Sequence, residues 1–136
     1  MIQKFTHATI FCLNQEEAKH FYTEVLGFEV RTDVKMGTFR WLTVAPKGQP
    51  DLELVLMEIN ANPPFDEPSA ASLRELVKTG KLGSVVFETA DCKATYQELK
   101  ARGAQFHSEP TERPYGIEAM LKDNSGNLFT LVQRPR

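Results

Sequence analysis

The feature that most constrains the fold of this chain is a pattern that occurs twice: a strand-like run, a helix and three further strand-like runs. In the first copy, a β-branched and aromatic run at 5–13 ends at Asn14, and Glu17 follows three residues later, the spacing of a capping box. Apolar residues then recur at helical period as far as Gly27, a glycine suited to a left-handed C-terminal cap. The apolar stripe consists of Ala18, Phe21, Tyr22, Val25 and Leu26.

Strand-like runs separated by turn residues follow this helix, and a connector then leads to the second copy. These runs lie at 28–35, 38–45 and 51–58. The segment 60–68 is interrupted by prolines and cannot continue a sheet. Apolar residues at helical spacing from Ala70 to Val77 predict a short helix that ends at Gly80. We interpret 59–81 as a connector.

The second copy begins with a strand-like run at 82–89 and a helix between the N-cap candidate Asp91 and Gly103. Its remaining strand-like runs lie at 105–108, 116–122 and 128–133, and the last two are joined by the hairpin turn Asp-Asn-Ser-Gly-Asn at 123–127. An internal duplication is the economical interpretation. The pattern predicts an α+β fold of two βαβββ modules, about 1–58 and 82–136, within a single domain spanning 1–136.

Composition narrows the classes of partner and location. The 136 residues are 41% hydrophobic and 25% charged, as in an ordinary globular domain with one core. The net charge of −2 and the absence of a basic run argue against nucleic acid, and no apolar run approaches the ~20 residues of a membrane span. Cys12 and Cys92 occur singly, which favours a reducing, cytoplasmic compartment, and Cys92 lies on an apolar stripe where burial is expected.

Two strings carry a family resemblance: HATIFCLNQEEAKHFYTEVLGFEV near the N-terminus and DNSGNLFTLVQ near the C-terminus. Together with the duplicated order of elements, they resemble the vicinal oxygen chelate superfamily of glyoxalases, extradiol dioxygenases and bleomycin resistance proteins. The resemblance covers nearly the whole chain except the connector. It implies eight strands in a curved mixed sheet around a central cavity, and it suggests a homodimer.

The same resemblance implies four positions for metal ligands, one on each of four strands that face the cavity. They match His7, Glu53, Ser84 and Thr130, and the same 77 positions separate His7 from Ser84 and Glu53 from Thr130. A catalytic zinc site keeps at least three protein ligands, and neutral hydroxyls are poor ones. We therefore expect either no cofactor or a divalent metal in a rearranged site, in which Glu118 or Glu88 would join His7 and Glu53.

His7 and Glu53 allow several interpretations. His7 is either a cavity-lining histidine bonded to a neighbour or a functional group. In DLELVL, strand alternation places Glu53 on the face opposite the leucines, and a carboxylate facing a cavity is costly unless it is paired or serves a ligand. The two residues can satisfy each other, or act as an acid–base pair. Glu118 shares a face with Met120 and Thr130 if the turn at 123–127 pairs the last two, and it is otherwise a solvent-facing charge, as is Glu88.

The rest of the expected cavity is apolar and aromatic. Arg40 and Trp41 point to opposite sides of their strand, so only one of them can face the cavity: Trp41 would stack on a planar ligand, and Arg40 would favour an anion. Tyr115-Gly116 either closes over the cavity mouth or forms an ordinary turn. The candidate lining residues are Phe11, Trp41, Val55, Met57, Ser84, Glu118, Met120 and Thr130.

Three functions fit these residues. The first is a small-molecule-binding protein of the bleomycin-resistance type that lacks the full metal site. The second is a divalent-metal-dependent lyase, isomerase or dioxygenase that uses His7 and Glu53 in a rearranged site. The third is a metal-free enzyme with His7 and Glu53 as acid and base. The hydroxyls at Ser84 and Thr130 favour the first.

Overall fold

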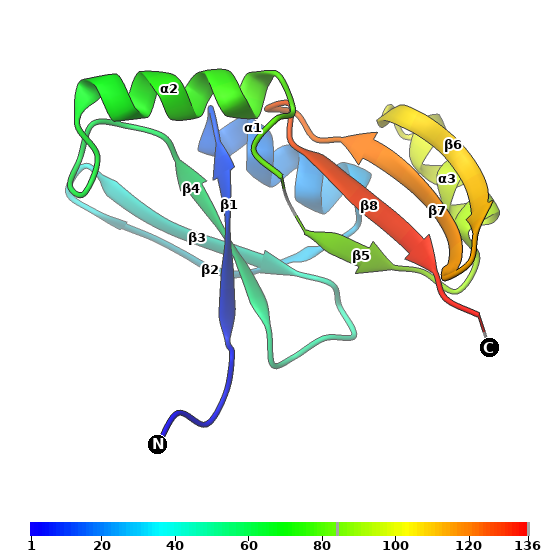
Figure 1. Cartoon of the computed structure of the whole chain (residues 1–136). Helices are drawn as coiled ribbons and strands as arrows, with labels where there is room; N and C mark the ends of the chain where they lie inside the picture. The colour runs from blue at the N-terminus through cyan, green and yellow to red at the C-terminus, as the bar shows by residue number, and fades with distance from the viewer. Residues whose placement is uncertain (84, 136) are drawn as a thin grey trace. The chain divides into compact units, whose positions relative to one another are not determined.

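The computed structural model describes residues 1–83 and 85–135, and Figure 1 shows its helices and strands. The chain divides into two compact units, Met1–Ala71 and Ser72–Arg136, and each unit contains one mixed sheet of four strands. The predicted α+β class with a repeated βαβββ order is therefore confirmed. No helix in the described ranges is long and apolar enough to cross a membrane.

The first unit is built on sheet A, whose strand order is β1-β4-β3-β2. Its strands are β1 (His7–Cys12), β2 (Glu29–Met36), β3 (Phe39–Ala45) and β4 (Glu53–Glu58). β1 runs parallel to β4, and the other neighbours are antiparallel. The predicted runs agree with these strands because alternating β-branched and aromatic residues bounded by turn residues leave little freedom of placement.

The first helix begins as predicted and then departs from α geometry. Helix α1 (Gln15–His20) is capped by Asn14, whose side chain accepts a hydrogen bond from the backbone N–H of Glu17 at 2.9 Å. The chain continues as a π-helical turn, η1 (Phe21–Val25), where a single α-helix was expected. The Thr23 hydroxyl donates to the Lys19 carbonyl at 2.7 Å, a back-bond to residue i−4 that bends helices.

Helix α1 covers one face of sheet A. The Gln15 side chain on this helix donates to the Leu56 carbonyl at 2.9 Å, and the Gln15 backbone N–H donates to the Glu58 carboxylate at 2.9 Å. The buried side chains on this side of the sheet form the core of the unit. They are Ile10, Cys12, Leu42, Val44, Leu54 and Leu56, and Tyr22 of η1 is buried with them.

The second unit repeats this arrangement around sheet B, with the strand order β5-β8-β7-β6. Its strands are β5 (Val86–Glu88), β6 (Gln105–Arg113), β7 (Gly116–Lys122) and β8 (Leu128–Gln133). Helix α3 (Cys92–Ala101) is capped by Asp91. The Gln133 side chain accepts from the first N–H of α3 at 2.9 Å, so the face of β8 that bears Gln133 is the one α3 covers.

Two strands of sheet B differ in length from the prediction. β6 continues through Pro110 to Arg113, whereas the sequence pattern placed this strand near 105–108. β6 is an edge strand, where a proline removes no ladder hydrogen bond, and its register shifts between Ser108 and Thr111. β5 begins at Val86 rather than at 82, after Gly83 with a φ of 85°.

The connector contains helix α2 (Glu67–Lys78), which begins three residues before the predicted Ala70. The Asp66 carboxylate accepts from the Ser69 backbone N–H at 2.8 Å and so caps the helix. Pro68 falls in the first turn, where no intrahelical N–H is required. The helix ends at Lys78, and the predicted cap Gly80 follows with a φ of 70°.

Candidate ligand-binding site

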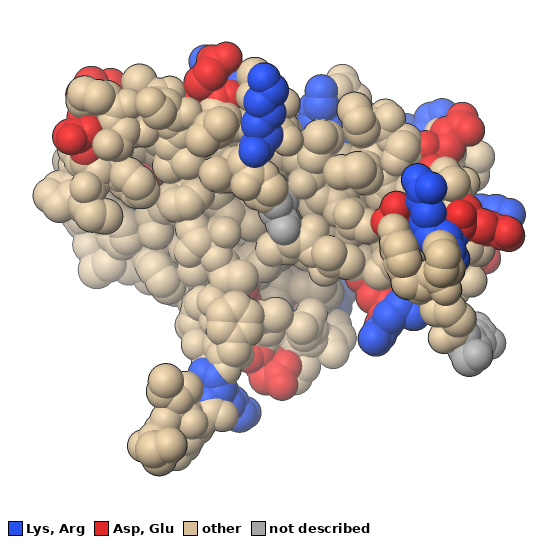
Figure 2. Space-filling model, viewed as in Figure 1, with Lys and Arg blue, Asp and Glu red and all other residues tan. Residues whose placement is uncertain are grey.

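The face of sheet A opposite α1, called here the open face of sheet A, gathers most of the predicted site residues of the first module. In the parallel pairing of β1 with β4, His7 lies beside Glu53 and Phe11 lies beside Met57. In the pairing of β3 with β4, Thr43 lies beside Val55. Since side chains directly across neighbouring strands share a face, all of these residues project to the same side. In the view of Figure 2, uncharged side chains make up most of the surface over this sheet.

His7 and Glu53 form the polar centre of this face. The His7 Nε2 and Glu53 Oε2 atoms are 3.8 Å apart, and the two side chains are 40% and 27% exposed. The buried hydroxyl of Thr43 donates to Glu53 Oε1 at 2.6 Å, which fixes the carboxylate through its other oxygen. His7 Nδ1 is 2.8 Å from the Thr6 hydroxyl. Glu53 Oε2 and His7 Nε2 are therefore positioned to accept or donate a hydrogen bond to a ligand. Thr43 was not among the residues predicted from the sequence.

Trp41 projects to the open face of sheet A, and Arg40 projects to the opposite face. Strand alternation alone did not show which of the two would do so. The Trp41 ring lies 5.9 Å from the His7 ring and 6.5 Å from the Phe39 ring, measured between centroids. Arg40 bonds on the other side of the sheet, where its guanidinium binds Asp33 at 2.8 Å and Glu16 at 2.6 Å. The Arg40 hydrogen bond, the largest influence, holds the pKa of the Asp33 carboxyl well below its usual range, and the same bond raises the pKa of Arg40.

Aromatic rings extend the open face of sheet A beyond Trp41. The Phe11 ring meets the Phe65 ring edge-to-face at 6.0 Å, and both lie within the first unit. Val55 is buried beneath this layer, and Met57 is half-buried beside Phe11. The face thus offers flat apolar surface around one carboxylate and one imidazole.

The face of sheet B opposite α3, called here the open face of sheet B, carries the remaining candidates. Thr130 pairs with Met120 on β7, as predicted from the turn at 123–127, and Glu118 pairs with Val132. Ser84, the other predicted position of this module, lies outside the described residues. Thr130 and Met120 are half-buried.

The two carboxylates on the open face of sheet B are each paired with an arginine. Glu118 Oε1 is 3.2 Å from Arg113 Nε, and a hydrogen bond to Glu118 raises the pKa of the Tyr115 phenol. Glu88 is paired with Arg134. Glu88 is an exposed charge at the end of β5, whereas Glu118 is only 20% exposed.

The residues do not fit a metal of the kind the resemblance implies. In the described part of the chain, no three His, Cys, Asp or Glu side chains come together as a group that could hold a metal ion. Sheet A supplies one imidazole and one carboxylate, and the Glu118 carboxylate on sheet B is engaged with a guanidinium. A catalytic zinc site uses three protein ligands, one more than the imidazole and carboxylate of sheet A supply.

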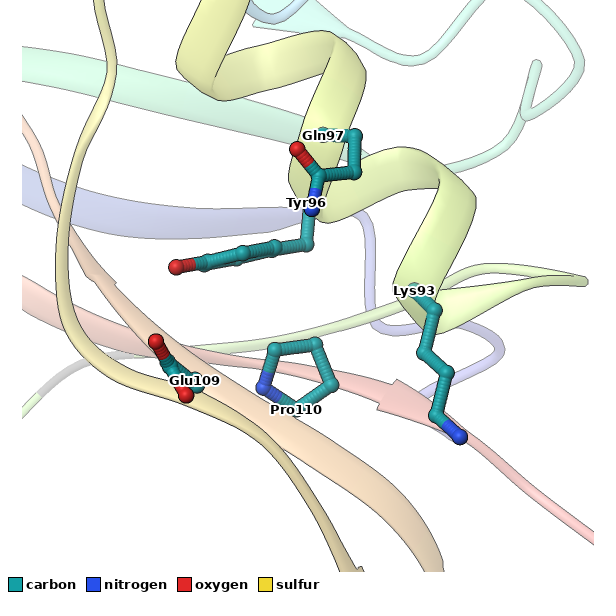
Figure 3. A pocket seen from close by; sticks show the side chains of 5 residues that line it. All are labelled: Lys93, Tyr96, Gln97, Glu109 and Pro110. Carbon is teal, nitrogen blue, oxygen red and sulfur yellow. The ribbon is translucent and has the colours of Figure 1, made fainter.

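Other polar groups lie away from the two open faces. Cys92 is fully buried, and burial, the largest cause, raises the pKa of its thiol, in agreement with an unreactive core residue. His20 and His107 are exposed. A shallow hollow of about 300 Å³ between α3 and β6 was not foreseen, and Figure 3 shows the Tyr96 ring reaching from the helix toward Glu109 and Pro110 on the strand.

Known proteins of similar sequence and structure identify the family. Residues 4–131 match the model of the Glyoxalase/Bleomycin resistance protein/Dioxygenase superfamily, and the chain belongs to this superfamily. The uncharacterized protein YurT of Bacillus subtilis (strain 168) is 36% identical over 96% of this chain and 99% of its own length.

Two solved structures share both the fold and part of the sequence. The crystal structure of UcmS2 matches with a TM-score of 0.92 and 44% identity, covering 98% of this chain and 99% of that one. TnmS3, an antibiotic binding protein from Streptomyces sp. CB03234, matches with a TM-score of 0.76 and 30% identity over 98% of both chains. The resemblance stated from the sequence is thereby confirmed.

Proposed function

We propose that this protein binds a small, planar, partly aromatic organic molecule on the open face of sheet A, without a metal of the family's usual kind. The observation that carries the proposal is the Trp41 ring beside His7 and Phe39, next to a carboxylate held by Thr43. An indole on a weakly charged face gives a large stacking surface at low entropic cost. TnmS3, which is named as an antibiotic binding protein, supports a binding role for a relative of this sequence.

Each group has a defined part in this proposal. Trp41 and Phe11 stack on the ring system, and Val55 and Met57 of the same face contribute apolar lining. Glu53 Oε1 already accepts a hydrogen bond from Thr43, and Glu53 Oε2 faces His7. Oε2 is therefore the atom that accepts a hydrogen bond from a ligand hydroxyl or amine. Ligand binding of this kind requires neither proton transfer nor a Lewis acid.

The direct test is titration of the protein with planar aromatic compounds of two to four rings. Trp41 is the sole tryptophan, so its fluorescence reports on this face without a label. We expect a saturable change, and calorimetry on the Trp41→Leu variant should show an affinity about fivefold lower, since an aromatic pair contributes about 1 kcal/mol beyond the area it buries. Trp41→Phe keeps a ring and should lose less. Equal affinity in all three proteins would contradict the proposal.

A metal-dependent lyase, isomerase or dioxygenase is the second candidate, because His7 and Glu53 lie 3.8 Å apart and supply two of the donors such a site needs. To test this candidate, the native protein and the Glu53→Gln variant are each titrated by calorimetry with Mn²⁺, Ni²⁺ and Zn²⁺. Tight stoichiometric binding that Glu53→Gln abolishes favours this candidate. Ligand affinity that is unchanged in EDTA favours the binding protein.

Assembly and location belong to the same proposal. We propose a homodimer, in line with the family resemblance, and light scattering that gives a monomer across the micromolar range would contradict it. We also propose a cytoplasmic location, since both cysteines are buried thiols outside any disulfide bond. Fractionation of the producing cells tests the location.

A further inference from the structure

The arginines and lysines on the strands of sheet A are engaged elsewhere or directed away from Glu53. Arg40 is bound by two carboxylates on the face of the sheet that α1 covers. Lys35 lies beside Arg40 in the β2–β3 register, so it projects to that face too. Arg31 donates to the Glu29 carboxylate at 2.9 Å and to two backbone carbonyls. In the described part of the first unit, no strand lysine or arginine is therefore left to neutralise Glu53.

Glu53 is an oriented, partly buried carboxylate with one oxygen left for a ligand. Its side chain is 27% exposed, and in the part of the chain that the structure describes its side-chain partners are Thr43 and His7. The Thr43 hydroxyl donates to Oε1 at 2.6 Å, so Oε2 keeps a set direction. A carboxylate that has lost part of its water and has no lysine or arginine as partner gains from a positively charged ligand.

A protonated amine matches the spacing of the two polar atoms on this face. His7 Nδ1 is 2.8 Å from the Thr6 hydroxyl, and when Nδ1 donates its proton there, Nε2 is an acceptor. Glu53 Oε2 and His7 Nε2 are 3.8 Å apart, so one ammonium group with hydrogen bonds of about 2.9 Å reaches both atoms. An ammonium has three N–H donors for this purpose, whereas an alcohol has a single O–H and satisfies one acceptor.

The rings beside Glu53 suit a cation as well as a flat ring. Trp41 lies two residues before Thr43 on β3, so both project to the open face of sheet A, about 7 Å apart along the strand. The Trp41 ring lies 5.9 Å from the His7 ring and 6.5 Å from the Phe39 ring. The face of an aromatic ring attracts cations, and an indole attracts them most strongly. A ligand ring stacked on Trp41 therefore has Glu53 within reach of a short arm that ends in an amine.

We propose that the ligand of the open face of sheet A is an arylalkylamine, a flat ring system joined by a short chain to a protonated amine, and that Glu53 Oε2 binds this amine. The inference rests on the proposed function, because it assigns the charge of the same ligand and the residue that selects it. Thr43 is a positioning residue, since it acts on the ligand through Glu53. Arg40, the residue that would have selected an anion, is bound on the other face.

The test uses three probes that share one naphthyl ring and differ in the charge of the arm. They are 2-(1-naphthyl)ethylamine, 2-(1-naphthyl)ethanol and 1-naphthylacetate, titrated by calorimetry at pH 7. We expect the amine to bind the native protein about tenfold more tightly than the alcohol, the effect of a charge-assisted hydrogen bond, and the acetate to bind most weakly. Glu53→Gln should remove the difference between amine and alcohol and leave the affinity of the alcohol unchanged.

Control variants separate this role of Glu53 from a general effect of charge or structure. Glu16→Gln removes the same charge from the other side of the sheet, where Glu16 binds Arg40, and should keep the full preference for the amine. Thr43→Val should lose part of the preference, and Thr43→Ser, which keeps the hydroxyl, should retain it.

The outcomes distinguish the inference from the proposed function. Equal affinity of amine and alcohol for the native protein, an equal loss of both in Glu53→Gln, or loss of the preference in Glu16→Gln overturns the inference alone. If none of the three probes binds the native protein, the proposed function fails with it.

Discussion

Replacement of Asp123 tests whether the turn at 123–127 stabilises the second unit or only connects two strands. The Asp123 carboxylate is 5% exposed and accepts four hydrogen bonds. Three come from the backbone N–H groups of Ser125, Gly126 and Asn127 at 2.9, 3.0 and 3.0 Å, and the fourth comes from the Asn127 side chain at 2.9 Å. One side chain therefore satisfies nearly every donor in the turn.

The expected loss in the free energy of unfolding depends on which hydrogen bonds of the turn remain in Asp123→Ala. The Gly126 N–H keeps its bond to the Asp123 carbonyl at 3.2 Å, and the Asp123 N–H keeps its bond to the Asn127 carbonyl at 2.9 Å. The other donors lose a charged acceptor, each such bond contributing about 1.5–3 kcal/mol, and water recovers part of the loss. We expect Asp123→Ala to lower the free energy of unfolding by about 3 kcal/mol.

Urea denaturation followed by far-ultraviolet circular dichroism measures this loss. Asp123→Asn is the matched control, because it keeps one carbonyl oxygen for the backbone N–H groups and places an amide against the Asn127 amide. It should cost about 1–2 kcal/mol. If Asp123→Ala and Asp123→Asn are equally stable, or if the alanine variant loses less than about 1 kcal/mol, the carboxylate is not what holds the turn.

Three further outcomes follow from burial, charge and backbone geometry. The pKa of Asp33 is lower in the folded protein than in the unfolded chain. The stability that its carboxylate contributes is therefore fully present above the unfolded pKa near 3.9 and is lost as the pH falls through the folded pKa. The fall in Tm from pH 5 to pH 2 should be smaller in Arg40→Met, which lacks this ion pair, than in the native protein. Both cysteines are buried, and the pKa of Cys92 is raised, so a thiol reagent at pH 8 should label neither until urea is added. Gly116→Ala should cost about 3 kcal/mol in urea denaturation because its Cβ would overlap a β8 carbonyl, whereas Gly48→Ala, with open space around it, should be near neutral.

The fold was predictable because its signals are local and repeated. The Asn14 cap, the Gly27 and Gly103 caps and the turn at 123–127 all occur where the sequence pattern placed them. The structure differs from the prediction where the local geometry depends on residues far away in the sequence. The π-helical turn at 21–25 has no signature in apolar periodicity, and β6 passes through Pro110 because its position at the sheet edge makes that proline harmless.

Only those features of the candidate site that follow from side-chain alternation along a single strand could be predicted from the sequence. Alternation placed Glu53 on the face opposite the leucines of β4. It did not show whether Arg40 or Trp41 points to that same face, because the two residues are adjacent and either orientation of β3 fits the pattern. The choice depends on Asp33, which lies beside Leu42 in the β2–β3 register and binds Arg40 on the far side of the sheet. Register between strands, which sets such contacts, is not encoded in the period of one strand.

The charged groups on the two open faces have different partners. On sheet B, Glu118 and Glu88 are each paired with an arginine. On sheet A, Glu53 is matched by a neutral hydroxyl from Thr43 and by an imidazole at 3.8 Å, too far for a hydrogen bond. The uncompensated carboxylate therefore lies on sheet A, and a ligand that donates a hydrogen bond or carries a positive charge gains more there than one that only stacks. Glu53→Gln keeps the shape and removes that charge, so it should weaken binding of an amine-bearing aromatic more than binding of its uncharged analogue.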